Sequence, residues 1–178
     1  MNTNALSIFV FGMSTYLKSF LKQFAFWLLL FQSGRLLFLI YHFSKLNAVG
    51  FFEISKVFWY AIPLDISTAC YLSFIPWIVI TIQLFWHHEI LKKILLGYSL
   101  LMIALVCTIL VSELEIYSQW GTKLSVKVFP YLLQPMEMVK SLPGFLFIAL
   151  LLLTTIYTFG SFYSYSKYIH HNTALNSK

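Results

Sequence analysis

The feature that most constrains this chain is a series of four long apolar blocks joined by short connectors. The blocks comprise residues 24–43, 58–86, 94–111 and 145–165 of a 178-residue sequence. Each is close to or above the ~20 residues that a helix needs to cross a hydrocarbon core about 30 Å thick. No remaining stretch is long enough to fold as a soluble domain. Any function must therefore lie within the bilayer, at its surfaces or in contact with a partner.

Composition supports the membrane class and selects helices over a barrel. Only 10% of the residues are charged and 60% are hydrophobic, with a mean hydropathy of +0.80, whereas soluble domains carry about 25% charged residues. Backbone groups in lipid must be paired within a helix or a closed barrel. Because residues 146–153 form a continuous apolar run without alternation, the barrel is excluded. The sequence predicts an all-α polytopic protein with four transmembrane helices.

The segments outside the blocks define the expected layout. Residues 1–23 are predicted to form a cytoplasmic or interfacial segment, residues 24–166 the membrane domain and residues 167–178 a cytoplasmic tail. Residues 113–143 form the longest connector and mix charged with aromatic side chains, which predicts an outer loop containing a helical interfacial segment. The second block contains Pro63 and Pro76, which should bend it or shift its start outside the hydrocarbon.

The distribution of charge indicates which partners are expected and how the chain is oriented in the membrane. The net charge of +6 is spread along the chain without a basic run, which argues against nucleic acid and indicates charge balance at the membrane surface. Four spans place both termini on one side. With the termini in the cytoplasm, the inner segments hold six lysines and the outer segments five. The short turn that contains Lys92 and Lys93 favours cytoplasmic termini.

Metal-binding and catalytic motifs are absent from the sequence. The adjacent histidines at 87–88 and 170–171 lack the i, i+4 spacing of a helical zinc site, so they are interpreted as polar flanks of the spans, as is His42. Cys70 and Cys107 fall within apolar blocks and are interpreted as packing residues. No nucleophile and base can be paired, and no metal ligands are assigned.

Two opposite charges lie inside the apolar blocks, where charge is expensive and usually functional. Arg35 lies about 12 Å below the outer end of the first block, and Asp65 about 10 Å below the outer end of the second. Neighbouring spans would bring them to one level. Two hypotheses follow: an ion pair that holds the bundle together, or an outward-facing pocket in which Arg35 binds a lipid phosphate through its planar fork.

A second polar group lies where the third span leaves the membrane. Glu113, Glu115 and Tyr117 form a candidate outer-surface polar cluster. Paired carboxylates can serve acid–base chemistry or bind a metal. Residues two apart on a helix point to different faces, however, so solvated acids at the end of a span are the favoured interpretation.

Three stretches together resemble the membrane domain of the lipoteichoic acid synthase-like family, the phosphoglycerol transferases of the sulfatase/alkaline phosphatase superfamily. Residues 35–38 read RLLF. Residues 62–72 read IPLDISTACYL, followed by Ile75 and Pro76, and are similar to an "LRxDLSxxxYLxxxP" pattern in the second span of that family. Residues 113–121 read ELEIYSQWG, followed by YLLQPME at 131–137, and resemble the segment after its third span.

The resemblance implies a protein of the bacterial cytoplasmic (inner) membrane with five spans and an extracytoplasmic catalytic domain. Such a domain uses a threonine nucleophile and a divalent metal, often manganese, to transfer phosphoglycerol from a lipid. This sequence departs from the pattern because it ends after the fourth span. No threonine can be assigned as nucleophile and no cofactor is expected in this chain. We expect a truncated or partial membrane anchor.

Several functions remain open from the sequence. The leading hypothesis is a non-catalytic domain that anchors a head-group transferase and contacts membrane lipid, including anionic phospholipid. The alternatives are a stand-alone accessory subunit bound to another membrane protein and a small transporter that uses Arg35 and Asp65. Short loops and the lack of broken-helix repeats argue against the transporter.

Overall fold

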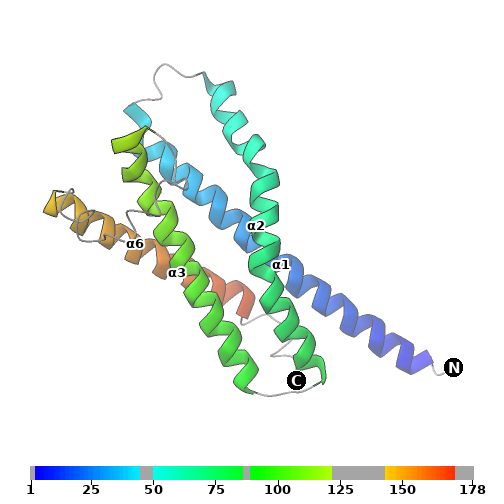
Figure 1. Cartoon of the computed structure of the whole chain (residues 1–178). Coiled ribbons are helices and arrows are strands. Elements are labelled where there is room, and N and C mark those ends of the chain that lie inside the picture. Colours follow the sequence, from blue (N-terminus) through cyan, green and yellow to red (C-terminus); the bar gives the residue numbers. More distant parts are fainter. Residues whose placement is uncertain (1–2, 45–49, 86–88, 122–142, 171–178) are drawn as a thin grey trace.

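The computed structural model describes residues 3–44, 50–85, 89–121 and 143–170, and its long elements are all helices (Figure 1). They are α1 (Thr3–Tyr41), α2 (Phe51–Phe85), α3 (Glu89–Trp120) and α6 (Gly144–Tyr165), which continues directly into the short π-helix η3 (Ser166–His170). Four stretches are long and apolar enough to cross a membrane: Leu17–Tyr41, Phe52–Gln83, Glu89–Gln119 and Gly144–Ile169. The chain is therefore an all-α, multi-pass membrane protein.

The first helix is longer than the first apolar block. Residues 1–23 were predicted to form a cytoplasmic or interfacial segment, and residues 3–23 are helical and continuous with the first span in α1 (Thr3–Tyr41). No proline occurs within these bounds, so nothing in the local sequence ends the helix where the composition becomes apolar. Polar and apolar parts thus share one continuous rod.

The second helix passes through both of its prolines. It begins at Phe51, well before Pro63, and continues beyond Pro76 to Phe85. A proline inside a helix removes the hydrogen bond to the carbonyl four residues earlier. At Pro76 that carbonyl belongs to Leu72, and it accepts a hydrogen bond of 3.2 Å from the hydroxyl of Tyr98 on α3. The neighbouring helix thus supplies the donor that proline lacks.

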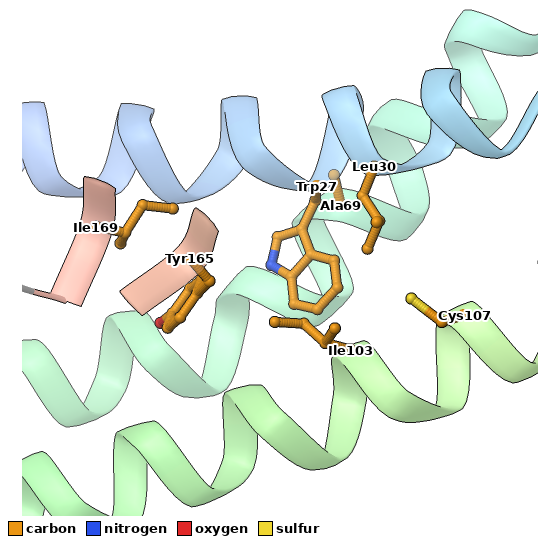
Figure 2. Packing of buried hydrophobic residues seen from close by; sticks show 7 residues of the cluster. All are labelled: Trp27, Leu30, Ala69, Ile103, Cys107, Tyr165 and Ile169. Atoms are coloured by element: carbon orange, nitrogen blue, oxygen red, sulfur yellow. The ribbon is translucent and has the colours of Figure 1, made fainter. Parts of the chain in front are cut away.

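Every described helix contributes to one buried cluster near the middle of the bundle. Its members are Trp27 and Leu30 on α1, Ala69 on α2, Ile103 and Cys107 on α3, Tyr165 on α6 and Ile169 on η3. Figure 2 shows the indole of Trp27 extending from α1 toward Ile103 on α3. The Tyr165 hydroxyl accepts a hydrogen bond of 2.7 Å from the Ser99 side chain. This polar contact joins α6 to α3 inside the apolar cluster.

Two contacts along α1 and α2 show that these helices run antiparallel to each other. Phe20 on α1 lies edge-on to Trp77 on α2, with ring centroids 6.5 Å apart. Farther along the same pair of helices, Arg35 contacts Asp65.

The close approach of α1 to α3 occurs at Gly34, where an added Cβ would lie 2.7 Å from Leu110 Cδ1. The glycine therefore lets the Leu110 side chain of α3 pack directly against the α1 backbone beside Arg35.

Candidate functional site

Arg35 and Asp65 form a bidentate ion pair between α1 and α2. The guanidinium Nη2 donates to Asp65 Oδ1 over 2.7 Å, and Nη1 donates to Oδ2. The two side chains are 14% and 5% exposed. Gln32 lies one helical turn before Arg35, and its Nε2 donates to Asp65 Oδ2 over 3.4 Å. The carboxylate thus accepts hydrogen bonds from two side chains of α1.

The geometry explains how two charges lie at this depth. Removing ions from water costs several kcal/mol for each, and the mutual attraction offsets this only when the geometry is good and the remaining lone pairs are satisfied. A parallel fork of two N–H donors on two carboxylate oxygens is the strongest arrangement available to these groups. The Gln32 amide adds a further donor to Asp65. The arrangement is that of a satisfied structural pair.

A small cavity lies next to the guanidinium. It is lined by Phe31, Gly34, Arg35, Phe38, Leu110 and Glu113 and measures about 50 Å³. A cavity needs about 10–15 Å³ of such space to hold one water molecule, so this cavity has room for water but not for a phospholipid head group. Of the two hypotheses for Arg35, the geometry favours the ion pair.

The outer-surface polar cluster is helical and partly buried. Helix α3 extends to Trp120, so Glu113, Glu115 and Tyr117 do not lie in the loop expected over residues 113–143. The continuation follows from packing, because Leu114 and Ile116 are buried against the bundle. The rest of that loop, including its expected interfacial helices, lies outside the described residues.

Glu115 is not the solvated acid that the sequence suggested. It is 7% exposed, and its carboxylate accepts hydrogen bonds from the Tyr41 hydroxyl over 3.1 Å and from Gln119 Nε2 over 2.7 Å. Glu113 instead lines the cavity beside Arg35. The two acids therefore face different neighbours, as residues two apart on a helix must. The correction arises because the end of α1 covers one face of α3.

His42 joins this cluster, although the sequence interpreted it as a polar flank. Its side chain is 5% exposed. The imidazole lies against Phe38, Tyr41 and Tyr117, with ring centroids 4.6, 5.1 and 5.0 Å away. Nδ1 lies 3.2 Å from the Phe38 carbonyl oxygen. The aromatic contact between Tyr117 and the end of α1 ties the C-terminal ends of α1 and α3 together.

The structure thus brings all five selected residues to the same end of the bundle, in two adjoining groups. Arg35 and Asp65 pair with each other beside Glu113, whereas Glu115 and Tyr117 contact the C-terminal end of α1. Sequence reasoning missed four further members: Gln32, Tyr41, His42 and Gln119. Spacing was an available signal for Gln32 and Gln119, which lie three and four positions from Arg35 and Glu115. Tyr41 and His42 carry no such signal.

No three His, Cys, Asp or Glu side chains come together as a possible metal site within the described ranges. Cys70 is exposed and Cys107 is buried, and both are free thiols. The histidines at 87–88 and 171 lie outside the described residues. Comparisons with protein families, with curated proteins and with solved structures find no match to this chain.

Proposed function

We propose that this chain is a non-catalytic membrane domain that anchors a sulfatase-like head-group transferase of the lipoteichoic acid synthase type in a bacterial cytoplasmic membrane. The observation that carries the proposal is that three stretches, distant in the sequence, contribute residues to one place in the structure. The resemblance rests on residues 35–38, 62–76 and 113–137, which are distant in the sequence. Arg35, Asp65 and Glu113, one from each stretch, lie beside one another at one end of the bundle.

The chemistry of this site supports anchoring over catalysis. The two intramembrane charges bind each other through both arms of the guanidinium. The adjoining cavity of about 50 Å³ is too small for a lipid head group. A residue set with no accessible nucleophile positioned beside a general base does not support acyl or phosphoryl transfer. The polar residues of this region hold α1, α2 and α3 in register, which is what an anchor requires.

The first test of the proposal is genomic. The DNA after the codon for Lys178 should continue in frame into a fifth apolar span and a metal-binding hydrolase domain. A stop codon at that point, in a chain that is expressed and stable, would contradict the anchor proposal and favour an accessory subunit.

A second test uses a hybrid enzyme. The four spans of this chain should replace those of a lipoteichoic acid synthase-type enzyme that keeps its own fifth span and catalytic domain. The hybrid should restore phosphoglycerol polymer, measured in cell-envelope extracts, whereas an unrelated four-span domain of equal topology serves as the control. A hybrid that inserts at normal levels without making polymer would count against the proposal.

A stand-alone accessory subunit is the second candidate, because α6 exposes an unusually continuous apolar surface. Only 6% of its most apolar stretch is buried, and Phe145, Ile156 and Phe159 are 83%, 69% and 73% exposed. Such a surface suits lipid or a partner helix. A photoreactive residue at Phe159 that gives one discrete protein adduct, while the same residue at Tyr71 on α2 gives lipid adducts alone, would favour this function.

A further inference from the structure

A groove of about 580 Å³ lies between α1 and the α6–η3 end of the chain. The last turns of α6 and η3 run alongside the middle of α1 (Figure 1). On α1 the groove extends from Lys22 to Ser33, a rise of about 16 Å along a helix. That length matches half of a ~30 Å hydrocarbon core, or one leaflet of the bilayer. The groove thus begins near a membrane surface and ends near the midplane.

Side-chain size explains why the groove forms. Ala25 on α1 and Ser161 and Ser164 on α6 are among the lining residues, and their short side chains leave space between the helices. Leu29 and Tyr168 form larger parts of its walls. The volume falls within the ~300–1,000 Å³ typical of small-molecule sites. The shape suits an extended, flexible and narrow occupant.

The serine hydroxyls along the groove already have partners. Ser33 Oγ donates to the Leu30 carbonyl over 2.8 Å and lies 2.6 Å from the Tyr157 hydroxyl. Ser164 Oγ donates to the Gly160 carbonyl over 2.9 Å, and Ser161 Oγ accepts a weak hydrogen bond from Cys107. An apolar chain can therefore lie on these serines without leaving a hydroxyl group unpaired.

One mouth of the groove is strongly cationic. Lys22 lines it, and Lys18 lies one helical turn earlier on the same face. Lys167 lies over the ring of Tyr168, 5.5 Å from its centroid. Residues 1–52 and 138–178 contain no aspartate or glutamate, so neither wall of the groove provides an acid to balance these lysines. The mouth is complementary to an anion at the membrane surface.

We propose that this groove binds one anionic phospholipid from the leaflet on the side of the termini. Its phosphate lies at Lys18 and Lys22, and one acyl chain follows the groove toward Ser33. Its cationic mouth at Lys22 lies 13 residues before Arg35 on α1, and the site does not depend on the anchor function. A lipid fits better than a second copy of the chain, because α1 and α6 supply no acid to meet the lysines across a symmetric contact.

Native mass spectrometry of the purified full chain provides the test, with dioleoylphosphatidylglycerol and dioleoylphosphatidylcholine as probes. The wild type should retain one phosphatidylglycerol and bind it more tightly than phosphatidylcholine. The double variant Lys18→Gln, Lys22→Gln should lose affinity for phosphatidylglycerol by about fivefold per lysine, the effect of one basic residue near an anionic surface. Its phosphatidylcholine binding should not change.

Two matched controls separate the groove from general effects. Lys92→Gln with Lys93→Gln removes the same charge from the start of α3 and should leave the lipid preference intact. Ser164→Phe fills the groove and should weaken the binding of both lipids. Thr155→Phe places the same ring on an exposed face of α6 and should leave the binding of both lipids unchanged.

An equal loss of phosphatidylglycerol affinity in the two double-lysine variants would overturn the proposal, because it would indicate an effect of bulk charge alone. Retained lipid in a folded Ser164→Phe variant, or a dimer that this variant disrupts without any effect on lipid, would also overturn it. Lys18, Lys22 and Lys93 are exposed and Lys92 is half-buried, so the lysine variants decide the question even where Ser164→Phe does not fold.

Discussion

The hydroxyl of Tyr98 on α3 donates a hydrogen bond of 3.2 Å to the backbone carbonyl of Leu72 on α2. Leu72 lies four residues before Pro76, which has no N–H to offer that carbonyl. In a bilayer, water is not available to satisfy the orphaned group. A side chain from one helix thus repairs the hydrogen bond that proline removes from another, which explains how α2 continues through Pro76.

This relationship predicts a conditional effect of Tyr98→Phe. Loss of the hydroxyl should lower the free energy of unfolding by about 1–2 kcal/mol, the cost of leaving a buried acceptor without a donor. In a Pro76→Ala background the effect should be much smaller, because the new N–H at position 76 restores the bond within α2. Unfolding in mixed detergent micelles measures both, with the exposed Tyr71→Phe as control. An equal loss in the two backgrounds would show that Tyr98 acts elsewhere.

The close approach at Gly34 predicts a packing effect on α1 and α3. A Cβ at this position would lie 2.7 and 2.8 Å from the two terminal methyls of Leu110, so Leu110 must move. Gly34→Ala should be about 1–3 kcal/mol less stable than Gly160→Ala, the usual range for overpacking. Gly160 is the matched control because its Cβ would meet open space. Equal unfolding midpoints for the two variants would contradict this packing.

The expected orientation can be tested at the two ends of α3. In a background of Cys70→Ala and Cys107→Ala, single cysteines at Ser118 and at Lys93 both lie on exposed positions. With cytoplasmic termini, an impermeant maleimide added to intact cells should label position 118, and position 93 after the membrane is opened. Labelling of position 93 alone in intact cells would reverse the orientation.

Catalysis by this chain alone is not expected, because no nucleophile and metal-binding group can be assembled from its sequence. Purified protein incubated with phosphatidylglycerol and manganese should release no diacylglycerol above a protein-free control. Turnover that persists through a second purification, and that follows the protein peak, would show that the chain is an enzyme.

The helical class and the four spans follow from the sequence because hydropathy over 20 residues is a strong, local signal. The ends of the helices do not. Nothing in residues 1–23 stops α1, and α3 extends to Trp120 because Leu114 and Ile116 pack against the bundle. Those boundaries depend on tertiary contacts, which composition does not record.

The depth of the candidate site in the membrane was predictable from the sequence, but its side-chain contacts were not. Counting residues from the span ends put Arg35 and Asp65 at one level because a helix rises by a fixed step. The burial of Glu115 and His42 depends instead on which face of α3 meets the end of α1. The rotation of one helix against another is set by side-chain packing along the whole interface, and a single sequence does not specify it.

A double-mutant cycle on Arg35 and Asp65 tests the central claim most directly, namely that this pair ties α1 to α2 within the membrane. Unfolding free energies should be measured in mixed micelles for Arg35→Leu, Asp65→Leu and the combined variant. Each single substitution should cost about 3–5 kcal/mol because it leaves a buried charge unmatched, and the double variant should cost less than either. Strictly additive losses would show that the two residues do not stabilise each other, and would contradict the account.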